Sequence, residues 1–148
     1  MRAETGLFAY MLYHPSGLAQ HQSPPASAGR GPACELALFV GARSNRERLF
    51  KAQELFEEHS PRLSAELGKA LMHAGPDGQG SHYLFFDYLM ASRSLAKLPK
   101  PKTRRARALL LELILAARLE DGSFLDTPVN GRVYGTAAAL LSLHALGK

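Results

Sequence analysis

The stretch Gly131-Arg132-Val133-Tyr134-Gly135-Thr136-Ala137-Ala138-Ala139-Leu140-Leu141 shares its pattern with an earlier one, Gly29-Arg30-Gly31-Pro32-Ala33-Cys34-Glu35-Leu36-Ala37-Leu38-Phe39. The two lie about 100 residues apart, and each follows a Gly-containing turn, Glu120 to Phe124 and Glu4 to Phe8. A third copy, Phe85 to Ala91, lies between them. We therefore predict a repeat of about fifty residues, in which each unit buries its apolar face against its neighbours.

Apolar residues recur at helical spacing along most of the chain, and no convincing run alternates with period two, so the sequence predicts an all-α fold. Ser44-Asn45-Arg46-Glu47 has the pattern of a capping box, and Ser60-Pro61 predicts the start of a new helix. The expected helices span residues 33–42, 44–59, 60–74, 82–97, 103–120 and 134–146.

The chain has 148 residues, of which 46% are apolar and 21% charged, and this composition predicts one globular domain over residues 1–148. The single cysteine excludes an internal disulfide and a Cys-rich zinc module. The most apolar segment, Ala108 to Ala117, is much shorter than the roughly twenty residues that a membrane-spanning helix needs. We therefore expect no transmembrane segment and predict a cytoplasmic location.

The turn Arg118-Leu119-Glu120-Asp121-Gly122-Ser123-Phe124 resembles the Gln-x-x-x-Asp-Gly-Ser-Trp turn of prenyltransferase and squalene-cyclase repeats, with Arg118 in place of Gln and Phe124 in place of Trp. The segment Tyr134-Gly135-Thr136-Ala137 is similar to the Tyr-Gly-Thr-Ala opening of the inner helices of that family. The resemblance implies an α/α toroid, in which outer and inner helices alternate around a central cavity. Copies of the unit would be centred near residues 29–59, 82–120 and 121–148.

A closed ring of this family contains roughly six hairpins, whereas this sequence has three inner-helix copies, so the resemblance implies a half ring. The first turn, Thr5 to Phe8, has no outer helix before it. An open half ring would expose apolar faces at its ends. We therefore expect pairing with a second copy in a homodimer, or with a missing N-terminal half of a longer protein.

Two arginines and two tyrosines are the candidate ligand-binding residues. Arg30 and Arg132 occupy equivalent positions before inner helices, where they would either bind an anionic group at the mouth of the cavity or cap carbonyls and pair with acids. Their repetition favours the second, structural role. Tyr83 and Tyr134 are candidates to line the cavity, because aromatic walls suit an apolar ligand such as an isoprenoid.

The resemblance implies two kinds of catalytic group, and the sequence lacks the motif of each. Terpene cyclases of the family use Asp-x-Asp-Asp, whereas the aspartates here are scattered singly, and Asp87 is the catalytic candidate that we retain. Protein prenyltransferases hold zinc through Asp, Cys and His, and Asp87, Cys34 and His82 form the alternative metal set. A buried small thiol is the preferred interpretation of Cys34. We predict no cofactor and no zinc, and leave open whether the chain is an enzyme.

A basic segment runs from Arg93 to Arg107 without an acidic residue. Such a segment could attract nucleic acid or an anionic membrane surface, but it has no interleaved aromatic residue and no nucleic-acid-binding motif, so a solvated loop and helix start is the preferred interpretation. Two functions remain. One is an isoprenoid-binding protein similar to prenyltransferases or terpene cyclases, and the other is a non-catalytic helical-repeat interaction module or a truncated remnant of a larger enzyme.

Overall fold

The computed structural model describes residues 8, 27–65, 67 and 83–147 of the chain. The elements are α2 (Gly31–Val40), α3 (Arg46–Ser64), α4 (Leu84–Ala96), the 3₁₀ helix η1 (Lys100–Thr103), α5 (Arg104–Ala116) and α6 (Gly131–Leu146). The predicted all-α fold is confirmed, since the described residues contain no strand, and Arg118 and Phe124 form only an isolated bridge. None of these helices combines the length and apolar character that crossing a bilayer requires.

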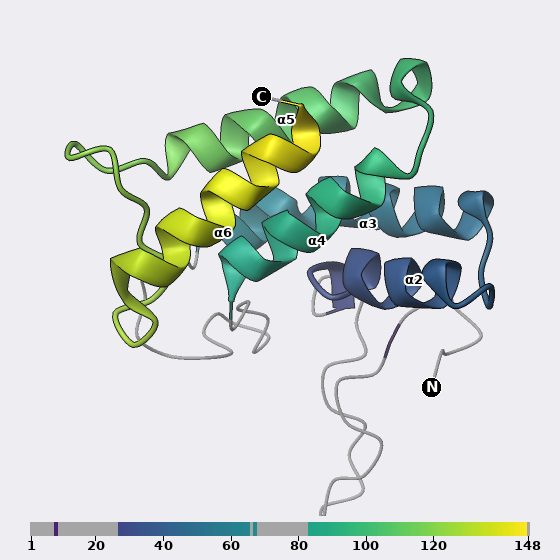
Figure 1. Ribbon diagram of the computed structural model, residues 1–148, viewed down its shortest axis with the longest axis horizontal. Helices are drawn as coiled ribbons and strands as arrows, with labels where there is room; N and C mark the ends of the chain where they lie inside the picture. Colours follow the sequence, from purple (N-terminus) through teal and green to yellow (C-terminus); the bar gives the residue numbers. More distant parts are fainter. Residues whose placement is uncertain (1–7, 9–26, 66, 68–82, 148) are drawn as a thin grey trace, which may run out of the picture.

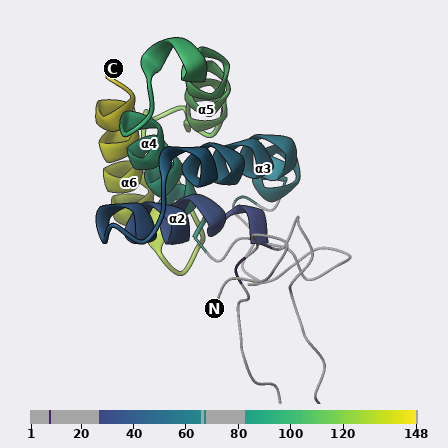
Figure 2. The ribbon, with the colours of Figure 1, turned by 90° about the vertical axis from the view of Figure 1, so that its right-hand side faces the viewer.

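The helices form two layers. Helices α2, α4 and α6 lie in one layer with their N-terminal ends toward the same side, and α3 and α5 lie behind them and run in the opposite direction (Figures 1 and 2). Helix α4 packs against all four of the others. We refer to α2, α4 and α6 as the inner helices and to α3 and α5 as the outer helices. The two kinds alternate along the chain, while closure of the layers into a ring stays a prediction.

The core lies between the layers and is built around α4. Phe85 and Tyr88 of this helix are 0% and 1% exposed, and their rings meet edge to face with centroids 5.6 Å apart. Ile114 enters the same cluster from α5, and Ala138 and Ala139 enter it from α6. Small side chains on α6 let its backbone approach α4. Burial of each large apolar side chain contributes about 1.5–3 kcal/mol to the stability of the fold.

Helix α3 continues through Pro61, so the predicted break at Ser60-Pro61 is wrong within the described residues. Proline has no N–H to donate to the carbonyl of Glu57, but the Ser60 hydroxyl donates to that oxygen instead, at 3.2 Å. Phe56 and Leu63, on either side of the proline, are both buried in the core. Their packing, with the replacement hydrogen bond, outweighs the helix-breaking tendency of proline. Most of the expected helix beyond residue 65 lies outside the described residues.

The cap of α3 is Asn45 rather than Ser44. The Asn45 Oδ1 atom accepts the Arg48 N–H at 3.0 Å. The Ser44 hydroxyl donates to the carboxylate of Glu35 on α2, which is 1% exposed. A buried carboxylate needs hydrogen-bond donors to offset its lost hydration, and this demand draws Ser44 away from the capping role that its sequence pattern predicts.

The turn between α5 and α6 is held by its own side chains. Asp121 accepts hydrogen bonds from both the N–H and the hydroxyl of Ser123, at 3.0 and 2.6 Å. Gly122 follows with φ of +83°, a conformation that favours glycine. Arg118, which stands where the resembling family has Gln, donates from Nε to the Gly122 carbonyl at 3.4 Å. The Asp-Gly-Ser pattern therefore corresponds to a closed turn with a left-handed glycine.

The segment that leaves this turn crosses the first turns of α6. The Phe124 N–H donates to Thr136 Oγ1 at 3.0 Å. A Cβ atom on Gly135 would lie 2.5 Å from the Phe124 carbonyl oxygen and 2.9 Å from the Asp126 nitrogen. Gly135 and Thr136 thus have separate physical roles. Gly135 lets the backbone of Phe124 to Asp126 approach α6 closely, and Thr136 accepts the hydrogen bond from the Phe124 N–H.

We predict that Gly135→Ala lowers the free energy of unfolding by about 3 kcal/mol, because the new methyl group would overlap backbone atoms that cannot rotate away. The matched control is Gly31→Ala at the start of α2, where the nearest atom would lie at 3.9 Å. That substitution should leave the stability unchanged or raise it by about 0.5 kcal/mol. Urea denaturation followed by circular dichroism measures both, and equal effects would contradict the assigned role of Gly135.

Tyr88 generates a prediction about alkaline stability. Its hydroxyl shares a 2.7 Å hydrogen bond with the Ser64 hydroxyl, and burial raises the pKa of Tyr88 to about 12. A raised folded-state pKa means that Tyr88 contributes stability below pH 10, which is lost as the pH rises from about 10 toward 12. At neutral pH, Tyr88→Phe should cost about 1 kcal/mol through the lost hydrogen bond.

The stability difference between the native chain and Tyr88→Phe should therefore shrink as the pH is raised from about 9 to about 11, because phenylalanine cannot ionise in the unfolded state. Chemical denaturation at several pH values measures this trend. A difference that stays constant across the range would show that the assignment for Tyr88 is wrong.

Candidate functional site

The N-terminal ends of α4 and α6 bring together the two predicted ligand-binding tyrosines. Tyr83 directly precedes α4, and Tyr134 lies in the first turn of α6. Their rings make an edge-to-face contact with centroids 6.2 Å apart. Phe86, in the first turn of α4, and Tyr83 are 41% and 42% exposed. We call Tyr83, Phe86 and Tyr134 the aromatic cluster.

The two predicted arginines make contacts within the chain. Arg30, next to the start of α2, donates from Nε to the Phe8 carbonyl at 2.9 Å and from Nη2 to the Ser27 hydroxyl at 3.4 Å. Arg132, in the first turn of α6, forms an ion pair with Asp121 of the preceding turn. Arg30 thus caps a carbonyl and Arg132 pairs with an acid, which are the two structural roles predicted as the alternative to anion binding. Binding of a ligand by either arginine stays a prediction.

Asp87, the catalytic candidate, lies in the first turn of α4 and is 8% exposed. A Cβ on Gly29 would lie 2.3 Å from its Oδ2, so the carboxylate packs directly against the turn that precedes α2. This position explains a glycine at residue 29, and it places the carboxylate between two inner helices.

Asp126 has a structural role that sequence patterns did not predict. It is 1% exposed, and its Oδ1 accepts the Phe85 N–H at 3.2 Å, so it caps α4 from a position 41 residues away in the chain. Its Oδ2 accepts a hydrogen bond from the Asn130 amide at 3.2 Å. Burial raises the pKa of Asp126, and these hydrogen bonds oppose the shift. Local capping rules examine only the residues beside a helix start, and Tyr83, the residue at that position, provides no side-chain cap.

The predicted alternative metal set is described only in part, because His82 lies outside the described residues. Cys34 is half-buried, and its burial raises the pKa of the thiol while the charge of Arg30 opposes this shift. Glu35 and Asp87 add to the raised pKa. No group of three or more potential metal ligands occurs within residues 8, 27–65, 67 and 83–147. The absence of a cofactor stays a prediction.

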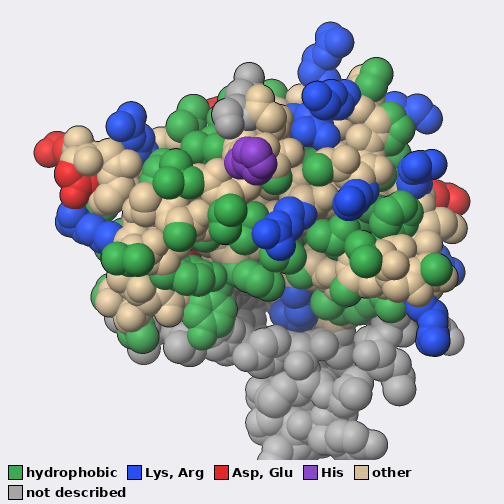
Figure 3. Space-filling view, in the orientation of Figure 1, with side chains coloured by type: hydrophobic (Ala, Val, Ile, Leu, Met, Phe, Trp, Pro, Cys, Tyr) green, Lys and Arg blue, Asp and Glu red, His purple; other side chains and the backbone are tan. Residues whose placement is uncertain are grey.

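The face of the inner helices that points away from the outer layer carries many apolar side chains (Figure 3). On α6, Val133, Leu140 and Leu141 are 87%, 58% and 47% exposed and lie on one side of the helix. Burial raises the pKa of Tyr134 to about 12. The site therefore offers apolar and aromatic surface with hydroxyl groups at one end.

Comparison with family models, with curated proteins and with solved structures gives no match to this chain.

We predict that Asp126→Ala lowers the free energy of unfolding by about 1–3 kcal/mol, because Phe85 and Asn130 lose a buried acceptor. Asp126→Asn keeps an oxygen that can accept the Phe85 N–H and should cost less. Asp121→Ala, at an exposed carboxylate, is the control and should cost clearly less, because solvent compensates for the lost acceptor. Equal losses for the two alanine variants in urea denaturation would rule out the capping role.

Proposed function

We propose that this chain is a helical-repeat binding protein of the prenyltransferase and squalene-cyclase type, which holds an isoprenoid or another apolar group against the aromatic cluster. The observation that carries the proposal is the contact of Tyr83 with Tyr134 at the starts of two neighbouring inner helices, together with the partly exposed Phe86 in the first turn of α4. Partly exposed aromatic rings that are held in fixed orientation form a surface against which an apolar ligand can be buried away from water. Because the rings are already ordered, little side-chain entropy is lost on binding.

The physical roles of the repeat residues support the resemblance. In the turn, Arg118, Asp121 and Gly122 each contribute to its closure. In the following helix, Gly135 and Thr136 receive the backbone that leaves the turn. Asp121, Gly122, Gly135 and Thr136 are positions at which the sequence is similar to the family, whereas Arg118 replaces the family's Gln, so the similarity falls largely on residues that determine this geometry.

The proposal is for binding, and catalysis is a separate question. Asp87 is the carboxylate that the sequence singles out as a catalytic candidate. It is buried against Gly29 and has partners within the chain. An acid that protonates a substrate must reach the reacting atoms. We therefore assign the aromatic cluster to ligand binding and give Asp87 no step in a reaction.

A second candidate function is protein–protein interaction, and the exposed side of α6 favours it. Val133, Leu140 and Leu141 together form an apolar stripe on an inner helix. Contiguous apolar surface of this kind is typical of interfaces. The partner that we propose for it is a second copy of the chain, which would cover the stripe with its own.

Calorimetric titration with farnesol, a neutral isoprenoid alcohol, tests the primary proposal. We expect saturable binding, and we expect Tyr83→Ala to weaken it at least about fivefold through loss of the ring contact. Tyr83→Phe keeps the ring and should bind nearly as well as the native chain. Val129→Ala removes an apolar side chain that is 74% exposed, lies outside the cluster, and should have no effect.

No heat of binding with farnesol would contradict the primary function. The molar mass in solution, measured by light scattering, separates the second function from it. A dimer that Leu140→Glu converts to a monomer, together with no response to farnesol, would support the interaction module instead.

A further inference from the structure

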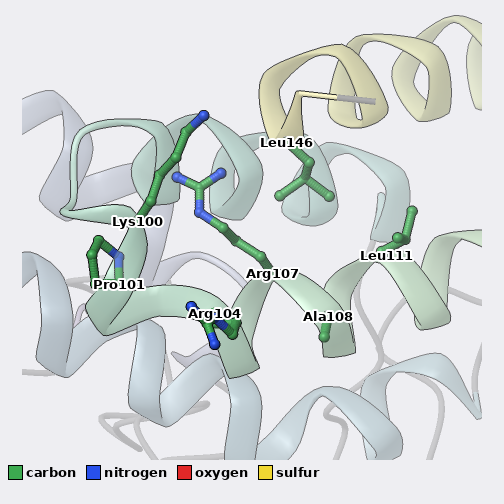
Figure 4. A pocket seen from close by; sticks show the side chains of 7 residues that line it. All are labelled: Lys100, Pro101, Arg104, Arg107, Ala108, Leu111 and Leu146. Atoms are coloured by element: carbon green, nitrogen blue, oxygen red, sulfur yellow. The ribbon is translucent and has the colours of Figure 1, made fainter.

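A pocket lies at the opposite end of the inner layer from the aromatic cluster. It has a volume of about 410 Å³ and is lined by residues of η1, the first half of α5 and the C-terminal end of α6 (Figure 4). Its walls combine two kinds of side chain. Pro101, Ala108, Leu111 and Leu146 are apolar, and Lys100, Arg104 and Arg107 are cationic. We call this the basic pocket.

Among the described residues, the cations of the basic pocket have no acidic partners. Within the described part of the chain, none of Lys100, Arg104 and Arg107 takes part in a salt bridge. The sequence from Arg93 to Arg107 contains no Asp or Glu. Lys and Arg side chains also gather on this side of the molecule (Figure 3). Three cationic groups around one cavity produce a positive potential that an anion would offset.

One of the three cations is held in place. Arg107 donates from Nε to the Thr103 hydroxyl at 3.0 Å and from Nη2 to the carbonyl of Leu95 at the end of α4. Thr103 is fixed in turn, because its hydroxyl lies 3.2 Å from the Pro99 carbonyl, to which it donates. In Figure 4 the guanidinium of Arg107 and the amino group of Lys100 extend toward the same side of the pocket. A positively charged group that is already ordered loses little entropy when it binds an anion.

The position of the basic residues along α5 adds to this argument. The first turn of α5 contains no acidic residue and no side-chain cap, and Arg104 and Arg107 lie in its first two turns. Cations near a helix N-terminus are disfavoured by the helix dipole, by about 0.3–1 kcal/mol each at exposed positions. Basic residues at this end make little contribution to the stability of the helix, whereas they complement a bound anion.

We propose that the basic pocket binds an anionic amphiphile, a molecule with a carboxylate or phosphate headgroup on an aliphatic chain. The headgroup lies between Lys100, Arg104 and Arg107, and the chain lies against Ala108, Leu111 and Leu146. The volume of about 410 Å³ is within the range of small-ligand sites. This site is separate from the aromatic cluster, and the inference does not depend on the proposed function.

Calorimetric titration of the full chain with dodecanoate and with dodecyl phosphate, below their micelle concentrations, tests the proposal and distinguishes the two headgroups. We expect one ligand per chain. The double variant Lys100→Gln/Arg104→Gln should weaken binding about tenfold or more, and rising salt should weaken it further. Ala108→Trp, at an exposed position, should fill the pocket and abolish binding without disturbing the core.

Matched controls separate the pocket from general positive charge. Arg105 is adjacent in sequence but faces α3, where burial raises the pKa of Glu57 and the charge of Arg105 opposes that shift. Arg105→Gln and Tyr83→Ala should therefore bind dodecanoate as the native chain does. Circular dichroism of each variant establishes that it is folded.

Three outcomes would overturn the proposal. Dodecanol binding as tightly as dodecanoate would show that the headgroup is not recognised. Undiminished binding by folded Ala108→Trp would place the ligand elsewhere. Binding of inorganic phosphate or a single-stranded oligonucleotide, with no binding of either amphiphile, would identify the basic segment as a surface for polyanions.

Discussion

The short segment from Phe124 to Asp126 is the constraint on which the inner layer depends. Its backbone crosses α6 so closely that residue 135 has no room for a side chain, and its first N–H is bound by Thr136. Its last residue accepts the N–H of Phe85 at the start of α4. The ring of Phe124 meets that of Phe85 with centroids 5.6 Å apart. One segment therefore determines the relative position of the N-terminal ends of α4 and α6, which carry the aromatic cluster.

The helical spacing of apolar residues was sufficient to predict the helical class, because no stretch alternates with period two. Gly135 and Thr136 could also be identified from sequence. The cap that Asp126 supplies to α4 could not, because nothing near Leu84 indicates a carboxylate so far along the chain. Pro61 and Ser44 were misread for a related reason. At Pro61, packing of Phe56 and Leu63 in the core outweighs the helix-breaking tendency of proline. At Ser44, the buried Glu35 carboxylate takes the hydroxyl that would otherwise cap the helix.

For the predicted site residues too, some contacts follow from the repeat and others do not. Tyr83 and Tyr134 are in contact because equivalent positions of neighbouring inner helices lie side by side. The candidate arginines occupy equivalent positions too, yet each has a partner within the chain, the Phe8 carbonyl for Arg30 and Asp121 of the preceding turn for Arg132. The basic pocket had a signal in the sequence, the acid-free run from Arg93 to Arg107, but its apolar wall did not, because Leu146 comes from a different helix. The structure thus has aromatic surface at the N-terminal ends of α4 and α6 and cationic surface on η1 and the start of α5, near the C-terminal end of α6, which suits two chemically different ligands.

Amide hydrogen exchange of Phe85 and Phe124, followed by NMR, tests most directly whether the segment from Phe124 to Asp126 connects the inner helices. Both N–H groups donate to side chains from distant parts of the sequence. They should exchange only through global unfolding, at the rate of the slowest core amides of α4. Exchange of either amide as fast as that of an exposed loop residue such as Val129 would contradict the account.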